Sequence, residues 1–428
     1  MAQDQSRTVK HRRVFYIPGY DPIPPRRYRE LYRKEAAAQA KISGYEIGLK
    51  PRESARFGWN VNATIDGHQT FAEVEVLIWS DIVRTSMSNN IVATYWQLAR
   101  TAWIYVATGT LRRLMWMRKG PVIAAIYPVA MLIAQLLLAL LFGALLGSLL
   151  SNGAAWLASR AYALFGASMV PDALPWSLIL SGLYWAAFCG GLVFVLRWFK
   201  ARDGKLYAYY LMHDYAHSAQ LQGAYPQDLE ARLAGFADII ANALTDDTDE
   251  VLVVGHSSGA HLGVSILADL IRAGRIPANG PALSFLSLGQ VVPMVSFLPN
   301  AHRLRADLNY LSQRDELIWV DVTAPGDGCA FALCDPVAVS GVAPANQKWP
   351  LVVSAAFTQT LKPETWKALR WRFFRLHFQY LCAFDNPGDY DYFQITAGPR
   401  TLADRYADRK PSQSRIDVPA SRYTSMAA

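Results

Sequence analysis

A serine between two glycines stands at the centre of residues 251–264, which read VLVVGHSSGAHLGV. Gly255, Ser257 and Gly259 form a G-x-S-x-G pattern, whose small residues leave room for a strained backbone at the serine. An apolar run precedes the pattern and an apolar-faced segment follows it. We therefore expect a strand, a sharp turn and a helix that present the Ser257 hydroxyl as a nucleophile. The alternative is an ordinary tight turn that packs against the next strand.

The segment GHSSGAHL resembles the nucleophile turn of the alpha/beta-hydrolase superfamily, in particular its lipase-like and esterase-like members, including the histidine before the serine. The resemblance covers the soluble parts of the chain and not its apolar middle. It implies an oxyanion hole made by the backbone N–H groups of Ser258 and of a loop after an early strand. In that loop the chain has Pro18-Gly19-Tyr20 where the family has a His-Gly pair, and Tyr20 is the expected donor.

The same resemblance implies an acid and a histidine that follow the serine in chain order. Asp327 lies in a glycine-flanked loop after the apolar segment Leu317–Thr323 and is the expected acid, with Asp335 in an Asp-Pro-Val sequence as its alternative. His377 is the only histidine after His302 and is the expected base. Its surroundings, RFFRLHFQYL, are typical of a helix, so a buried structural histidine is the alternative.

These residues predict a serine hydrolase in which His377 activates Ser257 and Asp327 orients the imidazole. The expected substrate is a lipid or another carboxylic acyl ester, and no cofactor or metal ion is expected. An acyltransferase with the same triad and a non-catalytic membrane scaffold or binding protein are the alternatives. His213 and His217 have metal-like spacing but no evident third ligand, and we expect them to be solvated helix residues.

Two long uncharged segments interrupt the chain. The first is PVIAAIYPVAMLIAQLLLALLFGALLGSLL, within the uncharged stretch between Lys119 and Arg160, and the second is ALPWSLILSGLYWAAFCGGLVFVL, from Ala173 to Leu196. Each exceeds the ~20 apolar residues that cross a bilayer, so we expect a transmembrane hairpin. Gly143 and Gly147 would let a helix approach closely, within the hairpin or in a homodimer.

Basic residues gather outside the two segments. They are Arg112, Arg113, Arg118 and Lys119 before the first, and Arg197, Lys200, Arg202 and Lys205 after the second. The loop between them holds only Arg160 and Asp172. The positive-inside rule therefore predicts that both termini and the catalytic domain are cytoplasmic.

Composition agrees with a membrane protein that has a large folded core. The 428 residues are 52% hydrophobic with a formal charge of +8. Because many basic residues flank the apolar segments, membrane lipids are expected partners and nucleic acid is not. The four cysteines show no zinc-ligand spacing and are expected to be free thiols. The N-terminus lacks the apolar run of a secretory signal.

Alternating apolar strands and helices outside the hairpin predict an α/β fold, with a mainly parallel sheet flanked by helices, plus two transmembrane helices. The expected parts are a first hydrolase segment with the oxyanion loop, an interfacial helical segment, the transmembrane hairpin, a second hydrolase segment with the nucleophile, acid and histidine, and a disordered tail. Their residue ranges are 1–90, 91–120, 121–198, 205–408 and 409–428.

Overall fold

The computed structural model describes residues 8–87, 90–165 and 176–427. The chain divides into two compact units, each considered by itself. The sheet unit comprises Met1–Ser86, Thr101–Ala124 and His217–Ala428, and the hairpin unit comprises Met87–Arg100 and Ala125–Ala216. The sheet unit thus joins segments from both sides of the apolar middle of the chain.

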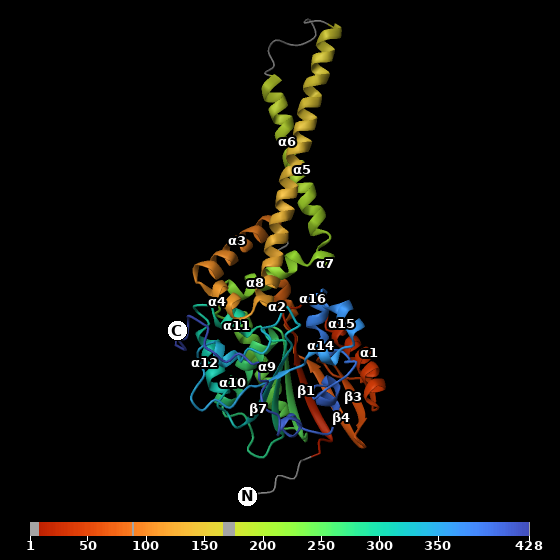
Figure 1. Cartoon of the computed structure of the whole chain (residues 1–428), viewed down its shortest axis with the longest axis vertical. Helices are drawn as coiled ribbons and strands as arrows, with labels where there is room; N and C mark the ends of the chain where they lie inside the picture. Colours follow the sequence, from red (N-terminus) through yellow and green to blue (C-terminus); the bar gives the residue numbers. More distant parts are fainter. Residues whose placement is uncertain (1–7, 88–89, 166–175, 428) are drawn as a thin grey trace. The chain divides into compact units, whose positions relative to one another are not determined.

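An eight-stranded sheet forms the centre of the sheet unit (Figure 1). Its strands are β1 (His11–Ile17), β2 (Glu46–Pro51), β3 (Gly58–Ile65), β4 (His68–Val76), β5 (Glu250–His256), β6 (Ala282–Leu288), β7 (Leu317–Thr323) and β8 (Leu351–Ser354). The order is β2-β3-β4-β1-β5-β6-β7-β8. Strands β4, β1, β5, β6, β7 and β8 are parallel, whereas β2 and β3 are antiparallel to their neighbours. The mixed α/β class and the mainly parallel sheet are confirmed.

Helices occupy most of the connections. The described α-helices are α1 (Arg26–Ser43), α2 (Ser80–Ser86), α3 (Ile91–Ala107), α4 (Thr110–Met117), α5 (Lys119–Phe165), α6 (Trp176–Lys200), α7 (Asp203–Leu206), α8 (Ala208–Ala219), α9 (Gln227–Ala243), α10 (Gly259–Arg272), α11 (Val292–Ser296), α12 (His302–Leu311), α13 (Pro336–Val339), α14 (Phe357–Thr360), α15 (Pro363–Leu369), α16 (Phe373–His377), α17 (Tyr392–Ala397) and α18 (Leu402–Tyr406). A short 3-10 helix, η2 (Gln379–Leu381), follows α16.

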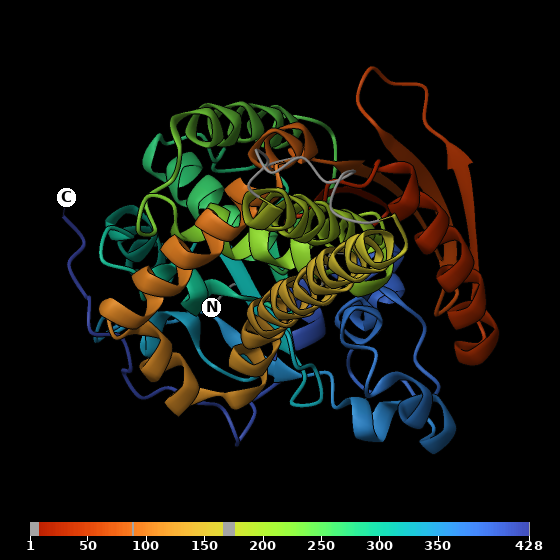
Figure 2. The same ribbon diagram turned by 90° about the horizontal axis from the view of Figure 1, so that it is seen from above.

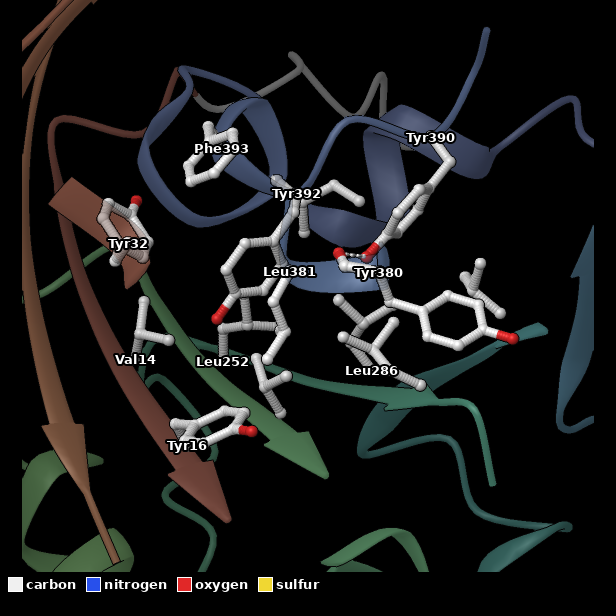
Figure 3. Packing of buried hydrophobic residues seen from close by; sticks show 14 of the residues in the cluster. Val14, Tyr16, Tyr32, Leu252, Leu286, Tyr380, Leu381, Tyr390, Tyr392 and Phe393 are labelled. Atoms are coloured by element: carbon white, nitrogen blue, oxygen red, sulfur yellow. Dashed lines mark hydrogen bonds between the residues drawn. The ribbon is translucent and has the colours of Figure 1, made fainter. Parts of the chain in front are cut away.

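Both faces of the sheet are covered at its centre, where β5 is buried along its whole length and β6 is buried at every residue after the first. On one face, Val14 of β1 shares a core with Tyr32 of α1 and Phe393 of α17 (Figure 3). On the other face, Phe285 of β6 lies against Gly263 of α10, where an added methyl group would meet its ring at 2.7 Å. In Figure 2, α1 (red) and α9 (green) accordingly lie on different sides of the sheet.

Local sequence explains the hairpin between β3 and β4. Asp66 and Gly67 have φ values of 54° and 79°, the left-handed conformation that a two-residue turn of this kind requires at both positions. The pairing runs from Ile65 opposite His68 to Gly58 opposite Glu75, as the Asp-Gly sequence predicted.

In the hairpin unit, α5 and α6 are long and apolar enough to cross a membrane, by length and composition. In their most apolar windows only 22% and 6% of the residues are buried, whereas a core helix of a soluble protein would be mostly buried. Helix α5 continues to Phe165, so Arg160 lies on the helix and not in a loop as expected. Asp172 lies outside the described residues.

The glycines of the G-x-x-x-G sequence lie at the contact between α5 and α6. A methyl group on Gly143 would lie 2.7 Å from the carbonyl oxygen of Phe188, and one on Gly147 would lie 2.8 Å from that of Tyr184. A methyl group on Gly191 of α6 would lie 3.2 Å from the Cα atom of Gly143. The small residues therefore let the two backbones touch within the hairpin, the first of the two expected uses.

The segment expected to be one interfacial helix forms two, α3 and α4, because Gly109 between them takes a left-handed φ of 73°. Tyr105 donates a hydrogen bond to the carbonyl of Met294, and Thr110 donates one to that of Phe297. These bonds hold the end of α3 and the start of α4 against α11 and the residue that follows it.

Two further expectations differ from the structure. Strand β2 was not expected, because its sequence EIGLKP is interrupted by charges and a proline. The tail from residue 409 was expected to be disordered because it is polar. Instead, Ile416 exchanges backbone hydrogen bonds with Leu333 and Asp335, and Ala420 donates to Val339, so the loop before α13 and the end of that helix supply its partners.

Candidate active site

The turn after β5 holds Ser257 in a strained conformation. Its φ is 58°, in the left-handed region that non-glycine residues rarely adopt. Neighbouring glycines permit this, because a methyl group on Gly255 would lie 2.6 Å from the carbonyl oxygen of Gly259, and one on Gly259 would collide with that of Ile17. From residue 251 to residue 260 the only side chain that is not buried is that of Ser257. The turn therefore presents one hydroxyl to the outside.

The sheet register brings the Pro18-Gly19-Tyr20 loop to this hydroxyl. Ile17 of β1 pairs with Gly255 of β5, so the residues after each strand emerge side by side. A methyl group on Gly19 would lie 2.9 Å from Ser257 Cβ and 3.3 Å from its Oγ. The indole N–H of Trp79 donates to the carbonyl of Pro18 at 2.9 Å and fixes the loop from behind.

Ser258 is the N-cap residue directly before α10, at the helix end where the first backbone N–H groups have no intrahelical acceptor. Its side chain is buried, and its hydroxyl has no hydrogen-bond partner among the described residues. The helix dipole adds positive potential at this end. The backbone of Ser258 is therefore suited to stabilise an anion, whereas its hydroxyl does not point to a polar group.

Asp327 and His377 meet at the same edge of the sheet, from the loop after β7 and the end of α16. The Nδ1–H of His377 donates to Asp327 Oδ2 at 2.7 Å. Burial alone would raise the pKa of Asp327, but the charge and hydrogen bond of His377, together with bonds from the Cys329 amide and the Tyr380 hydroxyl, lower it below its ordinary value. Asp327 is therefore held as a carboxylate that orients the imidazole.

His377 also lies next to the strand that precedes Ser257. The rings of His256 and His377 have centroids 4.8 Å apart, and His256 Nε2–H donates to the His377 carbonyl at 2.9 Å. A methyl group on Gly289, directly after β6, would lie 3.1 Å from His377 Cε1. Among the described residues no hydrogen bond joins Ser257 Oγ to His377 Nε2, and such bonds are often long before a substrate binds.

Sequence reasoning did not assign a role to His256 or Tyr380. Tyr380 donates to Asp327 Oδ2 at 3.0 Å, accepts from the Ala324 amide at 3.0 Å, and lies in the core beside α17 (Figure 3). The hydroxyl of Tyr390 donates to the Tyr380 carbonyl at 2.6 Å, marked by a dashed line in Figure 3. Position alone could have pointed to both residues, since one precedes Ser257 and the other follows His377 by three.

The alternative acid has a different role in the structure. Asp335 caps α13, where its Oδ1 accepts from the amides of Val337 and Ala338. Its Oδ2 accepts from the side chain of Gln347 at 2.8 Å. With both oxygens engaged in this way, Asp335 fixes the fold of its loop, and the structure brings Asp327 and not Asp335 to His377.

The histidines of α8 are not solvated, contrary to expectation. His213 is only 3% exposed, and burial lowers the pKa of His217. The His217 ring packs on those of Tyr20 and Trp79, with centroids 5.5 Å and 6.2 Å away. These aromatic contacts explain the burial of His217 without a metal ion.

A donor set capable of holding a metal ion does occur at Asp327. One ligand atom each from Asp327, Cys329 and His377 lie within 4.8 Å of one another. Such a set of carboxylate, thiolate and imidazole suits zinc. The sequence had suggested no metal here, because Cys329 and His377 are far apart along the chain.

No family model, curated protein or solved structure matches this chain.

Proposed function

We propose that this protein is a membrane-anchored serine hydrolase of alpha/beta-hydrolase type that cleaves carboxylic esters through an acyl-enzyme. The observation that carries the proposal is the convergence of three features at one edge of the sheet. These are the strained Ser257, the Asp327–His377 hydrogen bond at 2.7 Å, and Gly19 against the serine. A turn with a purely structural role would need neither the Asp327–His377 hydrogen bond nor the close approach of Gly19.

In the first step His377 Nε2 removes the proton from Ser257 as Oγ bonds to the ester carbonyl carbon. The backbone N–H groups of Tyr20 and Ser258 stabilise the oxyanion. When the carbon–oxygen bond to the alcohol breaks, His377 returns the proton to the departing oxygen. Asp327 keeps the imidazole in the required tautomer and stabilises its positive charge.

Water completes the reaction. It attacks the acyl carbon, gives a proton to His377, and that proton returns to Ser257 as the acid leaves. Transfer to another alcohol would follow the same steps with a different acceptor, so acyltransferase activity is the second form of this proposal. The non-catalytic scaffold is less well supported, because a scaffold does not require a buried carboxylate bonded to an imidazole beside a strained serine.

Membrane anchoring is supported by α5 and α6 together with the sheet. Strand β1 precedes the hairpin and β5 follows it, yet the two strands are paired. If both helices span the bilayer, the two halves of the sheet must lie on one side, and the basic flanks assign that side to the cytoplasm. An enzyme held there would meet esters of membrane lipids at short range.

The test is covalent labelling of the full-length protein with a fluorophosphonate. Labelling should disappear in Ser257→Ala, because the nucleophile is lost. The neighbouring Ser258→Ala is the matched control and should keep its labelling, since this residue contributes only its backbone N–H. Labelling of Ser257→Ala at the wild-type level would refute the assignment.

Measurements of ester hydrolysis then distinguish a mechanism based on the triad from one based on a metal centre. Hydrolysis that survives chelation but is lost in His377→Ala supports the triad. Hydrolysis that is lost on chelation and restored by Zn²⁺ would instead favour the Asp327–Cys329–His377 donor set.

A further inference from the structure

The segment before the base, residues 362–375, has the sequence KPETWKALRWRFFR, with five cations and one acid. Its basic side chains are all exposed: Lys362, Lys367, Arg370, Arg372 and Arg375. The segment comprises α15 and most of α16, and it ends two residues before His377. We call residues 362–375 the basic rim.

The cations of the basic rim lack carboxylate partners within the part of the chain that the structure describes. None of them forms an ion pair with a carboxylate among the described residues. Several other arginines of the sheet unit do form ion pairs, as Arg272 does with Asp307 and Arg303 does with Asp269. The positive charge of the rim is therefore available to an anion from outside the chain.

Large aromatic side chains are exposed among these charges. Trp371 is 73% exposed and Phe373 is 42% exposed. Tryptophan beside arginine and lysine is typical of the interface between lipid headgroups and hydrocarbon, where the ring enters the boundary and the cations meet phosphate.

A second exposed aromatic site lies at the same end of the sheet. Trp116 of α4 is 74% exposed and is followed by Arg118 and Lys119. In Figure 1, α4, α15 and α16 all lie at this end of the sheet. A methyl group on Gly120 would lie 3.4 Å from the Cα atom of Gly328, which is in the loop that carries Asp327. A methyl group on Gly328 would in turn lie 3.1 Å from the ring of Phe373. The start of α5 and the basic rim therefore both contact this loop.

We infer that the basic rim docks on the anionic headgroups of a membrane, with Trp371 inserted at the headgroup boundary. The positive charge of the rim is complementary to anionic lipid headgroups. The helix that begins at Lys119 is long and apolar enough to cross a membrane, so the same chain has a segment suited to bring the rim to a lipid surface. Because Phe373 contacts the acid loop and the rim leads directly into His377, docking would also hold the base in place. This last consequence rests on the proposed function, whereas docking itself does not.

Hydrogen exchange of the full-length protein in lipid nanodiscs tests the docking. One preparation contains phosphatidylcholine alone, and the other contains about 30% phosphatidylglycerol. We expect the amides of residues 362–375 to exchange at least about threefold more slowly in the anionic discs, because docking suppresses local opening. The amides of β5 and β6 should exchange alike in both and report an intact fold.

A matched pair of variants makes the test specific. In the triple variant Arg370→Gln/Arg372→Gln/Arg375→Gln, the amides of the rim should exchange at the same rate in both kinds of disc. The reason is that each cation near an anionic surface contributes a factor of roughly five to binding. Lys10→Gln/Arg400→Gln/Lys410→Gln removes the same charge from exposed sites elsewhere and should retain the difference. Equal exchange in both discs for the wild type, or equal loss in both variants, would overturn the docking.

Two further arms separate the sources of the effect. Inorganic phosphate added to the neutral discs should give no protection, and protection there would show a phosphate site in place of a membrane surface. The Ser257→Ala protein should show the full difference between discs, so that failure of docking and failure of the proposed hydrolase are recognised separately.

Discussion

His256 and His261 flank the Ser257 turn as neutral side chains. Burial lowers the pKa of each to about 3, with a further lowering from His377 for His256 and from His217 for His261. A neutral His256 can donate to the backbone of the base without adding a second positive charge. Its place before the serine therefore has a structural reason.

These histidines make the fold sensitive to acid. A histidine with a folded pKa near 3 and an unfolded value of 6.5 binds its proton more readily in the unfolded chain. The contribution of the neutral histidine to the free energy of unfolding is therefore fully present above pH 6.5 and is lost as the pH falls towards 3. Between pH 7 and 5 each such histidine costs about 2 kcal/mol.

Between pH 7 and pH 5, we expect the free energy of unfolding of His256→Gln to fall by about 2 kcal/mol less than that of the wild type. At pH 7 the variant should be the less stable of the two, because it loses packing in a buried site. The free energy of unfolding, measured with urea at both pH values, checks this. An identical pH dependence in both proteins would show that His256 is not neutral and buried.

The residue types of the site could be read from the sequence, but their contacts could not. The G-x-S-x-G pattern predicts the turn, because few other residues fit beside a left-handed serine. Asp327 and His377 were chosen from their order in the chain, while their 2.7 Å contact depends on β7 and α16 meeting at one edge. Asp335 follows the same strand eight residues later in the chain, and its capping of α13 together with the contact between Asp327 and His377 distinguishes the two aspartates.

At the scale of elements, the contact between the loop after β1 and the turn after β5 controls the geometry of the site. Gly19→Ala would place a methyl group 2.9 Å from Ser257 Cβ, and one of the two loops must move. A displacement near 1 Å typically costs about a hundredfold in rate, so kcat/KM for an ester should fall by roughly that factor.

Gly48→Ala is the control for Gly19→Ala, because a methyl group there has no atom within 4 Å. It should leave kcat/KM unchanged. Measured rates for Gly19→Ala at the wild-type level would mean that the loop after β1 does not approach the nucleophile.

Elements with a regular apolar pattern were predictable, and those decided by tertiary contacts were not. Strand β7 has the expected bounds, Leu317–Thr323, because all of its residues except the half-buried Ile318 are buried, and its sequence is apolar accordingly. Strand β2 was not predicted because its sequence contains Lys50 and Pro51, which an edge strand tolerates with little loss of stability. The tail after residue 409 is held by hydrogen bonds to residues far away in the sequence, which its own composition does not reveal.

At the scale of the whole molecule, the paired strands predict the membrane topology. Reporter domains fused to the N-terminus and to the C-terminus should both be cytoplasmic, because β1 and β5 belong to one sheet. Fusions to a reporter that folds only in the cytoplasm, and to one active only outside it, measure this in a bacterial host. Termini on opposite sides would exclude two spans with a shared sheet.

The position of β1 inside the sheet has a consequence for biosynthesis. Arg12 on this strand binds Glu250 on β5, 238 residues later in the chain. While the ribosome makes the intervening residues, the first four strands are already complete, and β1 exposes an unpaired edge that invites pairing with other chains. Slow synthesis of the intervening residues would therefore prolong the period in which the nascent chain is prone to aggregate.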